Sequence, residues 1–480
     1  MPTTVVWLRN DLRLRDNAAL THAAQHGAVV PVFVWAPEEE GDWPPGGAHR
    51  WWLGESLRAL DGALREKANR LIVRRGPSLD ALLDVAEATG ADRVVWQTRY
   101  TPPLARRDDE VRGALEDAGL AVRQFAGRLL HDPDAIRTTQ GNPYTVYTPF
   151  WKKLTAQLSV SEPLPIPRLG KTRAPETWPD SVSVEDLGLS AEAQDGVDWS
   201  GGMAEFWTPG EAGALARLDR FLGLAARYDD DRNTPALRHT SELSPHLHWG
   251  EISPRQVWTR VNAWVNNAPM REAADKYLSE VGWREFAYHV LHHFPHTTDE
   301  PLREKYADFP WREAPGALEA WQRGRTGYPI VDAGMRQLWA LGWMHNRVRL
   351  ITGSFLTKDL LVPWQEGARW FWDTLCGGDL ASNSLNWQWV AGSGADAQPF
   401  FRIFNPVSQG ERHDPDGAYV RQWVPELAGL PARWIHKPWE APDEVLEAAG
   451  VRLGETYPAP IVDHAERREE ALAALSALNA

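Results

Sequence analysis

The sequence predicts a doubly wound α/β domain followed by an all-helical domain, and three observations lead to this prediction. Short apolar runs alternate with amphipathic stretches over the first 130 residues. A proline-rich segment follows, and beyond residue 202 apolar side chains recur at helical spacing. We therefore expect an α/β domain at 1–130, an interdomain connector at 131–202 and a helical domain at 203–480.

Five short runs rich in β-branched residues predict the strands of the α/β domain. Their mainly apolar composition is typical of strands in a parallel sheet that helices flank. Segments with helical spacing, such as 53–68 and 79–88, separate them. The domain lacks G-x-G-x-x-G after its first strand and a Walker A sequence, which excludes the usual glycine-based nucleotide sites. The five runs cover residues 5–8, 29–35, 71–73, 94–96 and 121–125.

The helical domain is predicted from three long segments, 214–228, 271–292 and 331–361, whose apolar residues recur at i, i+3 and i+4. Two serines that precede prolines, Ser244 and Ser253, predict helix starts. A serine side chain can cap the free backbone amides, and proline is tolerated at the first helical position.

The composition excludes several classes of protein. The 480 residues carry a net charge of −14, which argues against a surface that is basic all over and binds nucleic acid everywhere. Local basic patches are compatible with this charge. The one cysteine, Cys376, forms no internal disulfide, and His289, His292 and His293 lack a matching acidic set, so no metal site is expected. No apolar run approaches the roughly 18 residues of a membrane span, and no signal peptide is visible. We expect a cytoplasmic protein.

Hydroxyl residues gather ahead of the first predicted serine–proline helix start. Thr240, Ser241 and Ser244 could hold a phosphate together with the amides of the helix N-terminus, without a glycine-rich loop. Plain N-capping would produce the same pattern. The residues alone leave both interpretations open.

Two helical segments place aromatic, charged and amide side chains on one face. Glu280, Trp283 and Arg284 stand at i, i+3 and i+4. An amide carries both donor and acceptor, which suits the edge of a base or of a flavin. Buried tryptophans with solvated charged neighbours would give the same pattern. The second segment contains Trp339, Trp343, Asn346, Arg347 and Leu350.

A third cluster interleaves indoles with polar side chains. Burying such polar groups is costly unless they have partners, and a planar ligand with polar edges would supply them. The cluster consists of Asp379, Asn383, Asn386, Trp387 and Trp389.

With these clusters in this order, the sequence closely resembles the photolyase and cryptochrome family over nearly its whole length. Several long blocks in register are more specific than any single motif. In detail it is most similar to the bacterial photolyases that repair cyclobutane pyrimidine dimers. The most specific blocks are GYPIVDAGMR at 327–336, GWMHNRVR at 342–349, WQW at 387–389 and FRIFNP at 401–406.

The resemblance implies FAD in the helical domain. Asn383 would lie near N5 of the isoalloxazine, which Arg349 and Asp379 would also line. The hydroxyl groups and helix N-terminus described above agree with a pyrophosphate site. The phosphates and ribityl chain would be held by Tyr228, Thr240, Ser241, Leu243, Ser244 and Arg284.

The resemblance also implies UV-damaged DNA as the partner and a flipped-out dimer as the substrate. Trp283 and Trp389 would clamp the dimer, and Glu280 and Asn346 would bond to its pyrimidine edges. Burial among indoles is expected to keep Glu280 protonated, so that it can donate to the dimer. Light-excited reduced FAD passes an electron to the dimer in this family, the ring opens and the electron returns.

Two further sets of residues follow from the resemblance. A relay of three indoles would carry electrons from the surface to a photo-oxidised flavin, through Trp311, Trp364 and Trp387. Arg232, Arg347 and Arg402 would meet DNA phosphates at the rim of the cavity, and Leu350 would lie against the lesion.

Two positions depart from the family pattern. Leu350 stands where dimer photolyases usually have methionine and where photolyases for (6-4) products have histidine. Gly377 stands where the family normally has an aspartate that pairs with the arginine equivalent to Arg349. We expect the unpaired Arg349 to stabilise anionic flavin, and Gly377→Asp to change the flavin potential.

A blue-light photoreceptor of the cryptochrome type without repair activity is the alternative function. Plant-type receptors usually carry aspartate at position 346 and add a long C-terminal tail, whereas this chain has Asn346 and stops soon after Pro458. The resemblance also implies a monomer with a second, antenna chromophore between the domains. The family uses 8-hydroxydeazaflavin, methenyltetrahydrofolate or a flavin there, and Arg99 and Arg107 favour the deazaflavin pattern.

Overall fold

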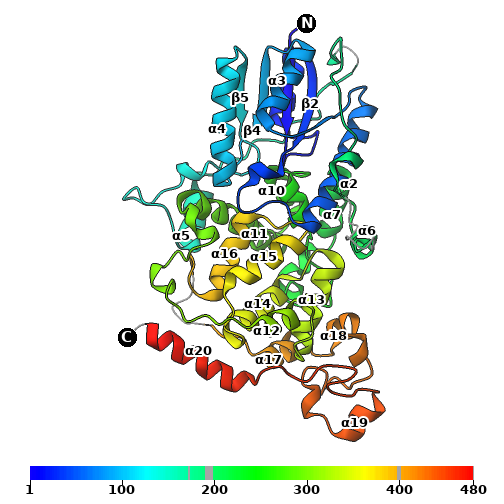
Figure 1. Ribbon diagram of the computed structural model, residues 1–480, viewed down its shortest axis with the longest axis vertical. Helices are drawn as coiled ribbons and strands as arrows, with labels where there is room; N and C mark the ends of the chain where they lie inside the picture. Colours follow the sequence, from blue (N-terminus) through cyan, green and yellow to red (C-terminus); the bar gives the residue numbers. More distant parts are fainter. Residues whose placement is uncertain (171–172, 190–197, 397–401, 479–480) are drawn as a thin grey trace.

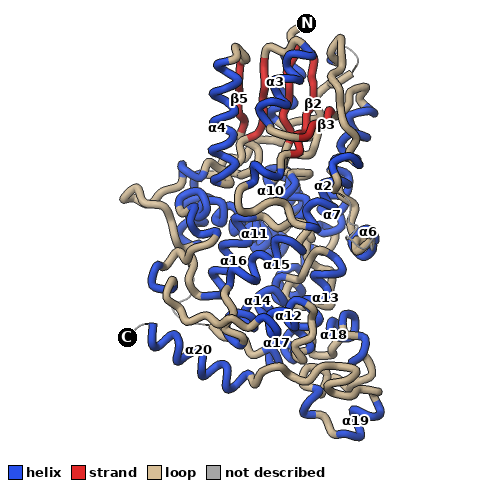
Figure 2. Tube along the Cα trace, viewed as in Figure 1, coloured by secondary structure: helices blue, strands red, loops and turns tan. Residues whose placement is uncertain are grey.

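The computed structural model describes residues 1–170, 173–189, 198–396 and 402–478. Its N-terminal part contains a five-stranded parallel sheet in the order β3-β2-β1-β4-β5. The sheet occupies the end of the molecule near the N-terminus, and helices make up the rest (Figure 1, Figure 2). The predicted fold class is confirmed. The strands are β1 (Thr3–Leu8), β2 (Ala28–Trp35), β3 (Ile72–Arg75), β4 (Arg93–Gln97) and β5 (Ala121–Phe125).

Helices cover both faces of the sheet, which makes the domain doubly wound. Apolar side chains of α1 (Ala18–His26) and α2 (Gly47–Glu66) pack on one face. Those of α3 (Ser78–Thr89) and α4 (Pro102–Asp117) pack on the other. All residues of β1 and β2 are buried, which explains why the runs 5–8 and 29–35 are continuously apolar in the sequence.

The rest of the described chain is built from helices and the loops between them. No helix within the described ranges is both long enough and apolar enough to cross a bilayer. The α-helices are α5 (Tyr147–Gln157), α6 (Gly201–Phe206), α7 (Glu211–Leu222), α8 (Tyr228–Asp231), α9 (Ser244–Trp249), α10 (Pro254–Trp264), α11 (Ala268–His293), α12 (Pro315–Gln322), α13 (Pro329–Leu341), α14 (Asn346–Ser354), α15 (Trp364–Thr374), α16 (Leu380–Ala391), α17 (Pro406–His413), α18 (Ala418–Trp423), α19 (Asp443–Ala448) and α20 (His464–Leu478). Short 3₁₀ helices are η1 (Pro37–Glu40), η2 (Pro133–Ala135), η4 (Glu185–Leu187), η5 (Ala225–Arg227), η6 (Pro295–Thr298), η7 (Glu304–Tyr306), η9 (Pro425–Leu427) and η10 (Pro438–Glu440), and η8 (Phe355–Asp359) is a π-helix.

The segment 331–361, predicted as one helical segment, is broken in two. Helix α13 ends at Gly342, whose φ of 60° is left-handed, and α14 begins at Asn346. A Cβ at Gly342 would lie 2.3 Å from Sγ of Cys376, so only glycine fits this turn. The break places Asn346 in the first turn of a new helix.

One of the two predicted serine caps is confirmed. Ser253 forms a capping box with Gln256 at the start of α10. At α9, however, Leu243 is the N-cap, and no side chain caps the helix. The prediction that Ser244 caps its helix is wrong, because Ser244 already lies inside the first turn, and its hydroxyl group is available for another partner.

Buried polar contacts join the α/β domain to the start of the helical domain. The carboxylate of Asp16 accepts hydrogen bonds from Ser253 Oγ at 2.5 Å and Arg255 Nε at 3.0 Å. Arg13 donates to the carbonyl oxygen of Gly250 at 2.8 Å. Because buried polar groups need partners, these bonds hold the sheet domain directly on α9 and α10.

Candidate functional site

A cavity of about 520 Å³ opens in the helical domain. Side chains from α9, α11, α14 and α16 line it, although they lie far apart in the sequence. The cavity brings together most of the residues expected at the site, namely Arg232, Ser241, Leu243, Ser244, Glu280, Trp283, Arg284, Asn346, Arg347, Arg349, Leu350, Asp379 and Trp389.

Helical spacing sets which side chains reach the cavity. On α11, Tyr277, Glu280 and Arg284 stand at i, i+3 and i+7 and so share one face of the helix. On α16, the carboxylate of Asp379 caps the helix by accepting from the backbone N–H of Ser382 at 3.0 Å. The capped end of α16 therefore points its acidic side chain at the cavity.

Asp379 is the most strongly stabilised anion of the site. Tyr288 Oη donates to its Oδ2, and Arg128 Nη2 lies 3.3 Å from the same oxygen. Burial alone would raise the pKa of Asp379, but hydrogen bonding to His248 and the charges of Arg128 and Arg284 hold it well below its usual range. Asp379 is therefore a carboxylate at neutral pH.

Several buried donors of the site have no partner among the described residues. Arg284 donates through Nη1 to the carbonyl oxygen of Arg128 at 2.9 Å, but its Nη2 is buried without a hydrogen bond. The hydroxyl group of Thr240 is also buried and unpartnered. Buried donors without acceptors are rare in folded proteins, so this chemistry fits a ligand that carries anionic oxygens.

Arg349 is half-buried and has no carboxylate partner in the described part of the chain. Its Nε donates to the carbonyl oxygen of Met344 at 2.8 Å, and burial lowers the pKa of its guanidinium to about 10. The side chain lines both the large cavity and a smaller one of about 80 Å³. The expectation that Gly377 leaves Arg349 without an ion pair agrees with this geometry.

Gly377 also has a packing reason to be glycine. A Cβ at this position would lie 2.6 Å from Cα and 2.7 Å from N of Pro245. Such distances require the backbone of α9 to move. An aspartate here would therefore do more than supply a charge to Arg349.

Asn383 lines the smaller cavity together with Arg349 and Trp387. Its side-chain nitrogen donates to the carbonyl oxygen of Ala368 at 2.9 Å, which fixes the orientation of the amide. Its Oδ1 is then the group available to accept a hydrogen bond from a ligand.

Glu280 differs from the expectation of a side chain enclosed by indoles. Its carboxylate forms an ion pair with Arg232, with Oε1 and Nη2 at 2.8 Å, and its side chain is 33% exposed. Arg232 also lies over the ring of Tyr228 at 5.1 Å. Arg232 is thus paired with Glu280 inside the cavity, and a contact of Arg232 with DNA phosphates at the rim stays a prediction.

The two indoles expected to clamp a substrate have different neighbours. Trp283 stacks on Tyr147, whereas Trp389 has the guanidinium of Arg402 5.9 Å from its ring centroid. Both indoles are half-buried and line the cavity. They therefore present aromatic surface where a planar ligand could contact it.

A basic groove of about 560 Å³ adjoins the cavity, and Arg347 lines both. Arg347 Nη2 donates to Asn233 Oδ1 at 2.7 Å, and Arg402 and Arg412 line the same groove. Phe401, which belongs to a block of the resemblance, lies outside the described residues. The groove gathers cations that suit a phosphate backbone.

Other predicted residues lie away from the cavity. Tyr228 is buried and packs edge-on against Tyr277 with ring centroids 5.5 Å apart. Trp364 and Trp387 belong to the large apolar cluster of the helical domain, and Trp311 packs against it. Of these indoles, Trp387 reaches the smaller cavity.

Several lining residues were not predicted from the sequence. Tyr277 could have been found, because it stands three residues before Glu280 on the same helix face. His248 and Asp396 carry no local signal, because tertiary packing alone brings their loops or helices to the cavity.

Two cavities lie between the domains, a small one of about 60 Å³ and an open one of about 630 Å³. Arg99 and Arg107 line the small one, but Arg99 is paired with Glu40 at 3.3 Å and Arg107 with Asp108 at 2.9 Å. The open cavity is the larger of the two. The two cavities share Trp35, Pro37, Pro45 and Trp372.

Comparisons with known proteins agree with this geometry. The family model described as DNA photolyase matches residues 4–168, and that of the FAD binding domain of DNA photolyase matches residues 277–477. The chain is 48% identical to a deoxyribodipyrimidine photo-lyase of Agrobacterium fabrum, covering 99% of this chain and 98% of the relative. It is 41% identical to cryptochrome-2 of Arabidopsis thaliana, covering 98% of this chain and 78% of the relative. The crystal structure of a bacterial class III photolyase from Agrobacterium tumefaciens superimposes with a TM-score of 0.94 at 46% identity, covering 100% of this chain and 98% of that one.

Proposed function

This chain belongs to the DNA photolyase family of light-dependent repair enzymes, and we propose that its substrate is the cyclobutane pyrimidine dimer. One observation carries the proposal. Glu280, Asn346, Trp283 and Trp389 line one cavity, which shares Asn346 and Arg349 with the smaller cavity that holds Asn383. A substrate with polar edges and apolar faces would therefore lie directly beside a planar cofactor.

The cofactor of this family is FAD, and the residues present fit it. The unpartnered Nη2 of Arg284 and hydroxyl of Thr240 would bind its phosphates, with Ser241 and Ser244 beside them. Arg349, Asp379 and Asn383 would line the isoalloxazine. When bound, FAD supplies the absorption of light and the electron that opens the dimer and then returns.

The protein side chains then act on the dimer itself. A dimer must be flipped out of the duplex to reach the cavity, which costs less for a damaged pair than for an intact one. Trp283 and Trp389 would cover its apolar faces and exclude water, and the amide of Asn346 would bond to a pyrimidine edge. Glu280 would exchange its ion pair with Arg232 for a bond to the dimer, and Leu350 would contact the dimer in place of the usual methionine.

The basic groove would hold the phosphates that flank the flipped dimer. Arg347 and Arg402 were expected to make such contacts, and Arg412 lines the groove beside them. Each phosphate contact adds about 0.9 to the slope of log K against log salt. We therefore expect Arg402→Ala to reduce the salt dependence of DNA binding without changing the preference for the lesion.

The electron relay, the second chromophore, the oligomeric state and the cellular location form part of the same proposal. Trp387, Trp364 and Trp311 would relay electrons to an oxidised flavin through the apolar cluster that they share. A second chromophore, with 8-hydroxydeazaflavin as the first candidate, would occupy the open cavity between the domains. The protein would act as a monomer in the cytoplasm.

The decisive experiment uses an oligonucleotide with one thymine cyclobutane dimer under anaerobic blue light. A (6-4) oligonucleotide and a dark reaction serve as controls. We expect light-dependent loss of the dimer alone. Flavin photoreduction without repair of either lesion would overturn the proposal and favour a photoreceptor of the cryptochrome type.

A further inference from the structure

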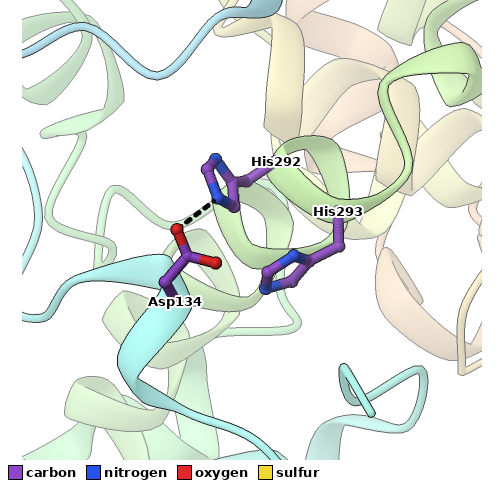
Figure 3. Close-up of side chains that lie close together, drawn as sticks. All are labelled: Asp134, His292 and His293. Atoms are coloured by element: carbon purple, nitrogen blue, oxygen red, sulfur yellow. Dashed lines mark hydrogen bonds and ion pairs between the residues drawn. The ribbon is translucent and has the colours of Figure 1, made fainter. Parts of the chain in front are cut away.

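A cluster of possible metal ligands lies outside the cavity, at the C-terminal end of α11. The last two residues of this helix, His292 and His293, turn their rings toward Asp134 of η2 (Figure 3). One ligand atom from each of the three side chains lies within 4.8 Å of the others. No acidic partner for these histidines was predicted from the sequence, because 158 residues separate Asp134 from His292.

We propose that Asp134, His292 and His293 form a binding site for a divalent transition-metal ion of the zinc class. Two imidazole nitrogens and one carboxylate oxygen suit Zn²⁺, whereas Mg²⁺ and Ca²⁺ prefer oxygen ligands alone. Three protein ligands leave a fourth position, which water fills in a half-exposed site of this kind.

The ligand geometry requires small movements only. His292 Nε2 and Asp134 Oδ2 are 3.0 Å apart, close to the separation of about 3.3 Å between two ligands of a tetrahedral zinc. The ion would replace the proton that now joins these atoms, and the imidazole would carry its hydrogen on Nδ1. Arg137 Nη2 stays on the other carboxylate oxygen, 2.6 Å from Oδ1.

His293 can join the ion without leaving a buried group unsatisfied. Its Nε2 now binds the carbonyl oxygen of Pro133 at 3.1 Å. The same carbonyl is 3.2 Å from His289 Nδ1, so it keeps a partner when His293 turns to the metal. Tyr144 N donates to Nε2 of His289 at 3.0 Å, which fixes the tautomer in which Nδ1 carries the hydrogen.

The position of the site also favours a cation. The C-terminal end of a helix carries partial negative charge from its free carbonyl groups, and α11 is a long helix that ends at His293. A bound ion would tie η2 to the same helix that carries Glu280, Trp283 and Arg284 on its cavity face. Binding to the folded state alone would stabilise that state by mass action.

The test is isothermal titration calorimetry of the full-length, flavin-loaded protein without an affinity tag, with ZnCl₂ as the probe. We expect one saturable site, no heat with MgCl₂, and at least a tenfold loss of zinc affinity in His292→Ala and in Asp134→Asn. Two controls should keep wild-type affinity: His296→Ala changes an exposed neighbour, and His26→Ala removes one of two histidines whose rings lie 4.0 Å apart.

A second measurement guards against variants that fold poorly. Zinc should raise the midpoint of thermal unfolding of the wild type and of His296→Ala, but not that of His292→Ala. Equal zinc binding in wild type and His292→Ala, or binding lost in His26→Ala instead, would overturn the proposal.

Discussion

The ring of Tyr147 stacks on the indole of Trp283, with centroids 3.8 Å apart and planes inclined by 12°. Tyr147 Oη donates to the carbonyl oxygen of Ser279 at 2.5 Å, which locks the ring onto α11. Gly282 lets α5 and α11 approach closely, because a Cβ at this position would lie 2.4 Å from the ring of Trp151. One face of Trp283 is thus held by the protein, and the indole is pre-positioned as a wall of the cavity.

This stack predicts a role for Tyr147 in substrate binding. Tyr147→Leu removes the aromatic partner, and a ring pair is worth about 0.5–1.5 kcal/mol, or roughly two- to twelvefold in affinity. We expect KM for a dimer-containing oligonucleotide to rise by this factor, with kcat little changed. Tyr147→Phe keeps the stack and should stay near wild type. Equal KM values for the two variants would contradict a positioning role.

The ion pair of Glu280 with Arg232 predicts how the acid acts on the dimer. If Glu280 leaves Arg232 to donate a hydrogen bond, an amide can replace it, because its NH₂ group is a permanent donor. Glu280→Gln should then repair dimers within about threefold of wild type, while Glu280→Ala repairs more slowly. Quantum yield under anaerobic blue light measures this, with the exposed Glu272→Gln as control. A Gln variant as slow as the Ala variant would show that the carboxylate is required.

The guanidinium of Arg349, unpaired with any carboxylate among the described residues, predicts a shift in the potential of bound FAD. Removing its charge by Arg349→Met makes the reduced, anionic form of the flavin less favourable, so the midpoint potential should fall by tens of millivolts. An anaerobic spectroscopic titration measures the potential directly. Arg347→Met alters a cation of the basic groove on the same helix and should leave the potential unchanged. No difference between the two variants would refute the stabilisation of anionic flavin by Arg349.

The contact between Gly377 and Pro245 predicts a folding defect that is independent of charge. Gly377→Ala forces a Cβ against the backbone of Pro245, so the free energy of unfolding should fall by about 1–3 kcal/mol. Gly62→Ala lies in α2 with nothing within 4 Å of the added Cβ, and should be neutral or slightly stabilising. Urea denaturation compares the two. A Gly377→Ala protein as stable as wild type would show that the backbone of α9 shifts at little cost, and would contradict the predicted defect.

The lowered pKa of Asp379 predicts a loss of stability in acid. Because its folded pKa is depressed, its contribution is complete above the unfolded value of about 3.9 and disappears as the pH falls further. The stability difference between wild type and Asp379→Asn should therefore shrink below about pH 4. Burial raises the pKa of Asp396. The stability difference between wild type and Asp396→Asn should therefore not shrink in this way as the pH falls. Urea midpoints across this pH range measure both differences.

Local patterns determined much of the fold and part of the site. The strands are visible in the sequence as short runs of mainly apolar residues, and the runs are most continuous where burial on both faces is complete, in β1 and β2. Glu280, Trp283 and Arg284 share a helix face because their spacing alone dictates it. The roles of individual residues at FAD and DNA came from the resemblance, and they remain predictions here.

Tertiary structure decided what no local pattern encodes. The pairs Arg232–Glu280 and Tyr147–Trp283 join separate helices, and the contact of Gly377 with Pro245 depends on how α9 meets the loop before α16. Asp134 reaches His292 only because η2 docks on the end of α11. Helix periodicity constrains neighbours within one or two turns, whereas these contacts are set by the packing of elements far apart in the chain.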